Sequence, residues 1–351
     1  MLLAALELDR KALSDVAEEY GLGRLVDGSG PIEQRGFRRY RLVTGKTTYN
    51  MDVYLVDDEV DLRREMDVMA FLEKHSFASP RLVVQRSGRP FAERGDYLLV
   101  VTRHPQAEFC DEAGLTEKRI YRSGSAIGEF HTLCRSYKKG ADSRMGFDQV
   151  FETYAEVRRR IPPYFKKIVR TFDEETEYLG NYLETKLPKG FIHGGLALDC
   201  ISFKGESVAC ISDFWDASRG KYVFDLATAV NAMCFVDGSY SLDRFIALMA
   251  GYESIRTLSL AEWDSFPNEM RFAALKFGVV SLHRFFDAGR EEGERINNDF
   301  RRYLERLRVL RREVDGGMES LLMAMATGYD YRKYQRVKGE DGNGGEGGER
   351  D

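Results

Sequence analysis

Cysteine is scarce in this sequence, and its spacing suits neither cross-linking nor metal binding. The 351-residue chain has five cysteines, an odd number, and none belongs to a C-x-x-C pair. A disulfide framework and a structural zinc site both require cysteines at paired, regular spacings, so the sequence argues against both. We expect free thiols, as in proteins of a reducing compartment.

Long apolar runs and an excess of basic residues are also missing. No stretch approaches the roughly 18 apolar residues that a membrane span requires. The apolar start of the chain is interrupted by Glu7, Asp9 and Arg10, and no cleavage site follows it, which is unlike a secretory signal. The formal net charge of -5 provides no basic field for nucleic acid or anionic lipid. We therefore expect a cytoplasmic protein that binds neither nucleic acid nor membrane.

The first hundred residues show the pattern of a small sheet that carries a helix. Apolar spacing predicts, in chain order, a helix, two strands joined by the turn Gly45-Lys46, a second helix and two further strands. These elements are expected at residues 7–26, 38–44, 47–56, 60–74, 81–85 and 97–102. The order of strands and helix favours an antiparallel sheet.

After residue 103 the pattern becomes mainly helical. Helices are predicted at 116–137, 147–187 with a break at Pro162-Pro163, 224–235, 242–252, 261–287 and 297–327, with two short strands between 191 and 217. The glycine-rich, acidic end at 335–351 has almost nothing to bury and is predicted to be disordered. We thus expect an α+β protein with regions 1–103 and 104–334 and a tail at 335–351.

Four segments in the helical region resemble a known enzyme family. Residues 193–200 read HGGLALDC and residues 211–214 read ISDF, which resembles the H-G-D-x-x-x-x-N loop and I-D-F strand end of aminoglycoside phosphotransferases and choline kinase-like proteins. Residues 224–227, FDLA, resemble the Y-D-L-A helix start of that family. Residues 248–287 resemble the last helices of type II homoserine kinases, and the similarity covers about residues 15 to 310.

The resemblance implies a bilobal, protein-kinase-like fold. Residues 1–103 would form the small antiparallel lobe that covers the nucleotide, and 104–334 would form the larger helical lobe with the catalytic loop and acceptor region. ATP and Mg²⁺ are the implied cofactors. The ligand would be a nucleotide or a small metabolite, and a protein partner is a further expectation.

The loop lacks residues that the family uses for phosphoryl transfer. The aspartate of H-G-D orients and deprotonates the attacking hydroxyl, while the loop asparagine and the I-D-F aspartate hold Mg²⁺. Gly195 stands at the first position and has no side chain. Cys200 stands at the asparagine position, and a thiol suits a hard ion poorly. Asp213 alone matches, so ATP and Mg²⁺ would be bound weakly, and loss of the base alone would slow transfer roughly 10²- to 10⁴-fold.

Other acidic and imidazole groups in this segment have two interpretations each. Asp199 could act as a displaced base or shape the loop, and Asp216 could give a metal a second carboxylate or lie in solvent. His193 is expected to brace the loop by hydrogen bonding rather than to take part in chemistry. Asp225 is expected to cap the helix that begins near Leu226.

In the small lobe, a turn with several arginines resembles the segment that covers nucleotide phosphates. The candidate cofactor-binding residues are Arg35, Gly36, Arg38 and Glu65. Arg39 belongs to the same basic run, which could equally be a solvated strand edge. Asp52 stands where many kinases place a phosphate-binding lysine, and Glu65 matches the usual helix glutamate without an evident cationic partner.

Three functions are consistent with these residues. The one we favour is a pseudokinase that binds a nucleotide or a small metabolite and transfers little phosphate. The second is an active ATP-dependent phosphotransferase that uses Asp199 or Asp216 on a small hydroxyl-bearing molecule, such as an amino alcohol or a homoserine-like compound. The third is an interaction scaffold that no longer binds nucleotide.

Overall fold

The computed structural model describes residues 8–33, 37–286 and 300–313, and these form two compact units. The first unit takes the described residues up to Cys110 together with Tyr137–Ala141 and Leu198–Ala217. The second takes the remaining described residues. The sequence-based division after residue 103 did not anticipate that the segment from Leu198 to Ala217 packs with the first unit.

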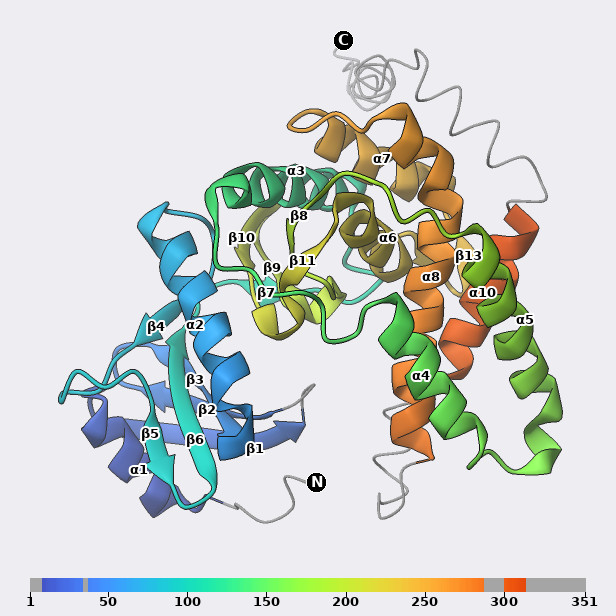
Figure 1. Ribbon diagram of the computed structural model, residues 1–351. Coiled ribbons are helices and arrows are strands. Elements are labelled where there is room, and N and C mark those ends of the chain that lie inside the picture. The colour runs from blue at the N-terminus through green and yellow to red at the C-terminus, as the bar shows by residue number, and fades with distance from the viewer. Residues whose placement is uncertain (1–7, 34–36, 287–299, 314–351) are drawn as a thin grey trace, which may run out of the picture. The chain divides into compact units, whose positions relative to one another are not determined.

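The first unit is built on a six-stranded antiparallel sheet with the strand order β1-β2-β3-β6-β4, and β5 pairs with β6 (Figure 1). Its strands are β1 (Leu25–Glu33), β2 (Arg38–Thr44), β3 (Thr48–Leu55), β4 (Arg81–Val83), β5 (Ala92–Arg94) and β6 (Tyr97–Arg103). Two helices accompany them, α1 (Arg10–Glu19) and α2 (Glu59–Lys74). The predicted strands, turn and second helix are confirmed.

The two faces of this sheet differ in chemistry. Helix α1 packs Leu13 and Val16 into a core that contains Tyr40, Leu42 and Met51 from β2 and β3. Successive side chains of a strand point to opposite faces, so Arg39 and Asp52, the neighbours of these core residues, point to the other face. The alternation in β2 and β3 thus brings polar groups to the face away from α1.

Strand β1 was missed in the sequence because it does not look like a strand. It contains Gly28, Gly30 and Pro31, residues that ordinarily weaken a strand or end it. It lies at the edge of the sheet and pairs with β2 through two register shifts. An edge strand tolerates proline, since one of its sides has no ladder to complete.

The segment 198–217 forms a second, smaller sheet in the first unit. Its order is β10-β9-β7, made of β10 (Ser207–Ile211), β9 (Ile201–Lys204) and β7 (Glu108–Phe109). The backbone N–H of Ile211 donates to the carbonyl of Ala78, which follows α2, at 2.8 Å. Asp213 and the short helix η5 (Phe214–Asp216) come next in the chain, and η5 packs against α2.

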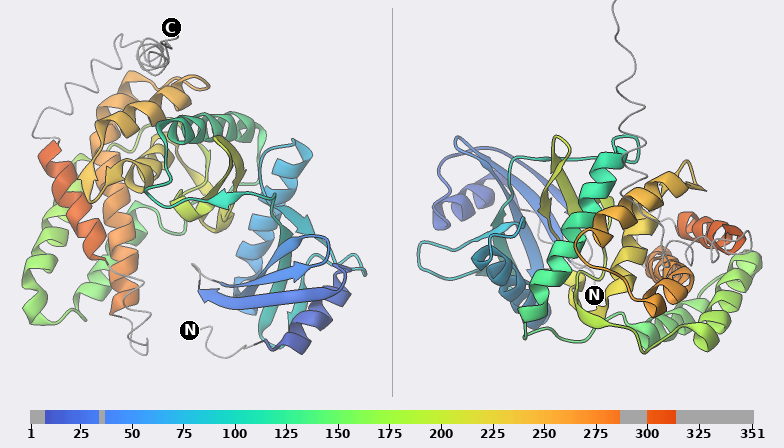
Figure 2. Two further views of the ribbon diagram at one scale, coloured as in Figure 1. Left: turned by 180° about the vertical axis from the view of Figure 1, so that it is seen from behind. Right: turned by 90° about the horizontal axis from the view of Figure 1, so that it is seen from above.

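The second unit is mainly helical, and α8 lies at its centre (Figures 1 and 2). Its helices are α3 (Glu117–Leu133), α4 (Phe147–Arg158), α5 (Lys166–Tyr182), α6 (Tyr222–Met233), α7 (Leu242–Glu253), α8 (Leu260–Phe285) and α10 (Arg301–Glu313). Two short antiparallel strand pairs belong to it: β8 (Lys189–Ile192) with β11 (Ser218–Lys221), and β12 (Phe235–Val236) with β13 (Ser239–Tyr240). Helix α8 is contacted by α4, α5, α6 and α10.

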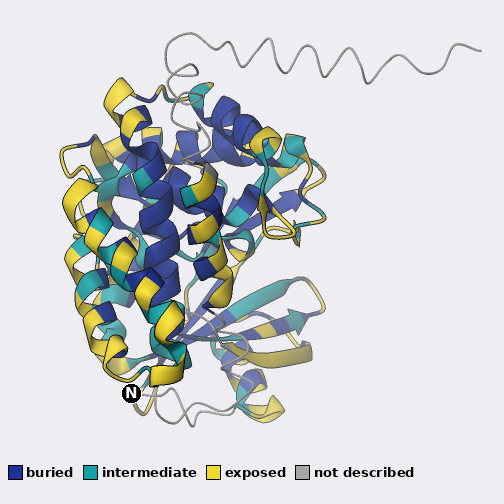
Figure 3. Cartoon of the chain, turned by 90° about the vertical axis from the view of Figure 1, so that its right-hand side faces the viewer, coloured by how far each residue is buried: buried dark blue, intermediate teal, exposed yellow. Residues whose placement is uncertain are grey.

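Burial in the second unit follows this arrangement (Figure 3). Most of α6 and of α8 is buried, including Phe272 and Phe277. Helices α3 and α7 approach closely because Gly124 and Gly251 lie at their crossing. A Cβ on Gly124 would come within 2.0 Å of the Leu248 carbonyl oxygen, so no larger residue fits without separating the helices.

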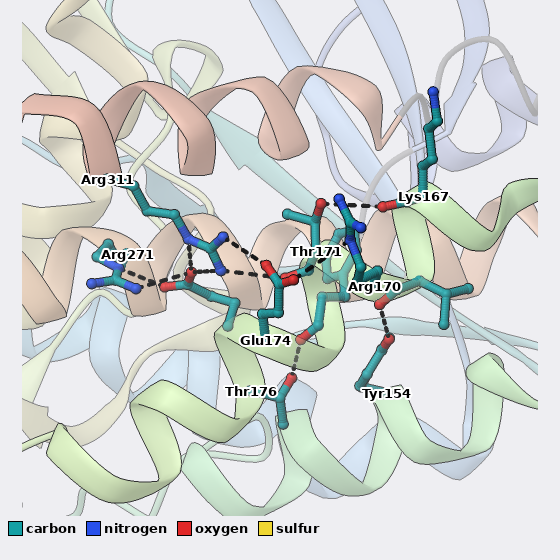
Figure 4. Close-up of polar contacts among 11 residues, drawn as sticks. Tyr154, Lys167, Arg170, Thr171, Glu174, Thr176, Arg271 and Arg311 are labelled. Atoms are coloured by element: carbon teal, nitrogen blue, oxygen red, sulfur yellow. Dashed lines mark hydrogen bonds and ion pairs between the residues drawn. The ribbon is translucent and has the colours of Figure 1, made fainter.

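A buried ion-pair cluster joins α5, α8 and α10 (Figure 4). The Glu175 carboxylate on α5 accepts from Arg271 Nε and Nη2 at 2.7 and 3.1 Å, and from Arg311 Nε at 2.6 Å. Arg311 also donates to Glu174 Oε2 at 3.2 Å. The Arg271 guanidinium lies 3.8 Å from the ring centre of Tyr178. Arg271 and Arg311 therefore both bond Glu175, and the buried carboxylate has two countercharges.

Several expectations lie outside the described residues or are limited by them. The tail at 335–351 and the end of the helix predicted at 297–327 fall outside. Within the described helices, none is long and apolar enough to cross a membrane. The five cysteines are all described, and each is a free thiol.

Candidate functional site

In the second unit, the loop at residues 193–195 is anchored by a buried aspartate. The Asp225 carboxylate on α6 accepts the backbone N–H of His193 at 2.6 Å and that of Gly194 at 2.7 Å. His131 of α3 adds its Nε2, 3.0 Å from Asp225 Oδ2. Burial would raise the pKa of Asp225, but the hydrogen bonds from His131 and Gly194 outweigh it and hold that pKa below its usual value.

The prediction that Asp225 caps its helix is wrong. Helix α6 begins three residues earlier, at Tyr222, with Lys221 as its N-cap residue. Asp225 therefore lies inside the first turn, and its carboxylate points to the loop. His193 is buried. Its backbone N–H donates to Asp225, and this hydrogen bond helps to hold the loop.

A buried lysine reaches the same loop from α8. Lys276 Nζ donates to the Gly194 carbonyl oxygen at 3.1 Å and lies 5.1 Å from the ring centre of Phe224. This carbonyl belongs to the peptide that precedes Gly195, the residue predicted to replace the catalytic aspartate. Gly194 itself has φ +79°, a conformation that favours glycine. The loop is thus fixed on both sides although its carboxylate is missing.

Asp199 and Cys200 lie in the short helix η4 (Leu198–Cys200) of the first unit. Cys200 is buried, and its Sγ is 3.8 Å from Asp199 Oδ1. The Cys200 carbonyl accepts the backbone N–H of Ser212 at 2.9 Å, which brings Cys200 next to the strand end that carries Asp213. Cys200 and the segment that leads to Asp213 therefore lie close together in the first unit.

The Arg39 side chain forms an ion pair with Asp213, the aspartate of the ISDF segment and the predicted metal ligand. Arg39 lies on β2 directly across from Asp52 on β3. Its Nε and Nη2 donate to the two oxygens of Asp52 at 2.7 and 2.9 Å, and Nη2 also donates to Asp213 Oδ1 at 2.7 Å. All three side chains are at most 15% exposed. Arg39 is thus the cationic partner of Asp52, and it comes from the neighbouring strand.

Glu65 on α2 belongs to the same cluster without touching the cation. It accepts from the Tyr54 hydroxyl at 3.1 Å. Burial, with the charges of Asp213 and Asp52, raises the pKa of Glu65 to about 8. Burial also raises the pKa of Asp52, and Arg39 opposes that rise. Glu65 is therefore mainly protonated at neutral pH.

Aromatic rings and a histidine surround the Arg39 guanidinium. It lies 5.1 Å from the ring centre of Phe37, which packs on Tyr54 at 4.9 Å, and Tyr54 packs on Trp215 at 5.2 Å. Burial and the charge of Arg39 lower the pKa of His104, just after β6, to about 4. The surroundings of Arg39 are therefore largely uncharged outside the carboxylates.

The remaining predicted residues are dispersed or not described. Arg35 and Gly36 lie outside the described residues. Arg38 is half-buried on β2, across from Val53, and Asp216 ends η5. Asp213 has φ +66° and ψ +60°, a left-handed conformation uncommon for a residue other than glycine. These assignments remain predictions.

The donors of this region do not fit a divalent metal. A Mg²⁺ ion requires several oxygen ligands in a near-octahedral arrangement. Asp213 already bonds a guanidinium, the asparagine position offers the Cys200 thiol, and within the described residues no group of three His, Cys, Asp or Glu side chains could hold a metal.

Comparison with known proteins places these features in a family. The sequence profile of the phosphotransferase enzyme family matches residues 30–258. The chain belongs to this family. A homoserine kinase of Methylobacterium radiotolerans is 27% identical over 286 residues, covering 79% of this chain and 86% of the relative. This confirms the resemblance to homoserine kinases.

Solved structures confirm the kinase-like fold. An amicoumacin kinase solved with AMP-PNP, Ca²⁺ and its ligand superimposes with a TM-score of 0.63 at 15% identity, covering 93% of this chain and 97% of that one. A microcompartment-associated aminopropanol kinase gives a TM-score of 0.60 at 16% identity, covering 88% and 98%. At these identities the likeness establishes fold alone.

Proposed function

We propose that this phosphotransferase-family protein binds a nucleotide or a small metabolite and transfers phosphate slowly or not at all. The observation that carries the proposal is the ion pair between Arg39 and Asp213. It occupies the one metal-ligand position that still matches the family motif, while Gly195 leaves the base position without a carboxylate. Positioning of a ligand needs neither group, whereas phosphoryl transfer depends on both.

The preserved loop supports binding rather than loss of the whole site. Asp225, His131 and Lys276 hold the loop in a defined conformation with buried, charge-assisted hydrogen bonds. Such bonds are costly to leave unpaired, so a loop kept in this state fits a site that still holds a ligand. A scaffold without a ligand has no need of this arrangement.

An active enzyme is the second candidate, and the relation to homoserine kinases favours it. In that case the acceptor would be a homoserine-like compound or an amino alcohol, and Asp199 or Asp216 would act as the base. A base must come within hydrogen-bond reach of the hydroxyl whose proton it takes, and Asp199 follows Gly195 by four positions in the sequence.

Two assays separate these functions. Thermal unfolding with ATP measures binding, because a ligand of the native state raises apparent stability by mass action. Product formation from ATP and a panel of homoserine and amino alcohols measures transfer. We expect a rise in melting temperature without product. Phosphorylated product at an ordinary rate that Asp199→Ala or Asp216→Ala abolishes would establish the second candidate instead, and neither binding nor product would favour the scaffold.

A paired substitution sharpens the test. Gly195→Asp together with Cys200→Asn restores the two residue types that the family uses in the loop. If Arg39 holds Asp213 as described, the double variant stays slow until Arg39 is also replaced. Ordinary activity in the double variant alone would show that the ion pair is no obstacle.

A further inference from the structure

The guanidinium of Arg39 has donors left over. An arginine carries five N–H donors, one on Nε and two on each terminal nitrogen. Nε and Nη2 make three hydrogen bonds, to Asp52 and Asp213. The two N–H groups of Nη1 donate to no residue in the described part of the chain. The side chain is 12% exposed, so a rigid guanidinium presents one unused end beside two carboxylates.

The unused end suits one kind of ligand. A guanidinium fixed through its other nitrogens presents the two N–H groups of Nη1 in a set direction, and a phosphate oxygen is a strong acceptor for them. Asp52 and Asp213 would repel an anion, but protonation of Glu65 removes a third negative charge from the cluster at neutral pH. Arg39 also stands across from position 52, where many kinases place the lysine that meets nucleotide phosphates.

We propose that the positive charge of Arg39 takes the place of a metal ion in this cluster and has two tasks. Through Nη2 it keeps a divalent metal from Asp213, and through Nη1 it binds a phosphate oxygen of a nucleotide that carries no metal. The inference deepens the proposed function and rests on it for the nucleotide. The ligand that Arg39 selects is the free nucleotide rather than its magnesium complex.

This arrangement reverses the usual role of magnesium. In an ordinary kinase the metal bridges nucleotide and protein and strengthens binding. In a magnesium complex of the nucleotide, the metal neutralises part of the phosphate charge that attracts Arg39. The metal would also meet Asp213, which is already bonded to Arg39. Magnesium therefore leaves nucleotide binding unchanged or weakens it.

Metal binding alone tests the first task. Mn²⁺ is titrated, with its free concentration followed by electron paramagnetic resonance, into the wild type, Arg39→Gln, and Arg39→Gln with Asp213→Asn. Arg41→Gln is the matched control, because Arg41 is an exposed arginine on the same strand and the same face. We expect Arg39→Gln to bind one Mn²⁺ at least tenfold more tightly than the wild type and the control, and the double variant to lose the gain. Equal Mn²⁺ binding by wild type and Arg39→Gln would overturn the inference.

Nucleotide binding tests the second task. ADP and ATP are titrated calorimetrically into the wild type with EDTA and with excess Mg²⁺. We expect affinity in EDTA to equal or exceed that in Mg²⁺, and Arg39→Lys to weaken binding in EDTA about tenfold. Lysine keeps the charge but cannot bond Asp52, Asp213 and a phosphate in the same fixed geometry. Arg39→Lys also keeps the test open if Arg39→Gln does not fold.

The outcomes distinguish the inference from the proposed function. Nucleotide binding that needs Mg²⁺, or that survives Arg39→Lys unchanged, contradicts the inference and leaves the proposed function standing. If no nucleotide binds in EDTA or in Mg²⁺, a nucleotide is excluded as the ligand of the proposed function. The second task of Arg39 is then excluded as well. The Mn²⁺ titration then still decides the first task.

Discussion

Two buried arginine–carboxylate clusters, one in each unit, differ in how their charges are matched. Around Glu175, two arginines bond one buried carboxylate, and both of its oxygens are bonded. Around Arg39, one guanidinium faces Asp52 and Asp213, and burial together with the charges of these two carboxylates raises the pKa of Glu65. The first cluster has what a structural clamp between helices needs. The second retains acidic excess and unused donors, as expected where a ligand completes the site.

The largest effect should come from unbalancing the structural cluster. Glu175→Gln leaves Arg271 buried without its countercharge, and loss of one partner of a buried pair costs about 3–5 kcal/mol. Chemical denaturation should therefore show a loss of that order in the free energy of unfolding. Glu174→Gln is the control, because Glu174 is 52% exposed and exposed pairs contribute at most about 1 kcal/mol. Equal losses in both variants would contradict the comparison.

The next effect depends on pH and concerns Glu65. Unfolded, its carboxyl ionises near 4.5, whereas in the fold its pKa is about 8. Between these values the folded state keeps a proton that the unfolded state has released, so stability falls as pH rises towards 8 and then levels off. Glu65 faces Tyr54, Asp52, Asp213 and Arg39.

Glu65→Gln should remove this dependence while keeping an oxygen for the Tyr54 hydroxyl. Relative to the variant, the wild type should lose on the order of 3 kcal/mol between pH 5 and pH 8.5, measured by urea denaturation at each pH. Parallel pH profiles of the two proteins would show that Glu65 is ionised throughout and that the cluster is less acidic than described.

The smallest effect is expected in the loop anchor. Asp225→Asn keeps the size of the side chain but turns one acceptor into a donor that faces a backbone N–H. Loss of one charge-assisted hydrogen bond costs about 2–3 kcal/mol, to be measured by denaturation at pH 7. Because the pKa of Asp225 is held low, the advantage of the wild type is full above the unfolded pKa and disappears as pH falls through the folded one. An advantage that persists at the acidic end would contradict this role.

Much of the Arg39 cluster could be predicted from sequence, except for its decisive contact. The predicted two-residue turn Gly45-Lys46 places Thr44 opposite Thr47, and the same register places Arg39 opposite Asp52, as observed. The contact with Asp213 joins residues 174 positions apart. Strand pattern carries no information on such a contact, because it depends on where the segment 198–217 packs.

The second unit shows the same division between local and distant information. Helical periodicity located α3 to α8 because each buries a continuous apolar face. The role of Asp225 was missed, since an aspartate near a helix start usually acts as a cap, whereas its hydrogen bonds go to a loop some thirty residues earlier and to His131 on α3.

The most direct test of the account is a crystal structure of the protein grown with ATP and Mn²⁺, with anomalous diffraction measured at the manganese edge. The account predicts no manganese peak at Asp213, with Arg39 Nη2 still within hydrogen-bond distance of its carboxylate. A manganese ion coordinated by Asp213, with Arg39 turned away, would contradict it.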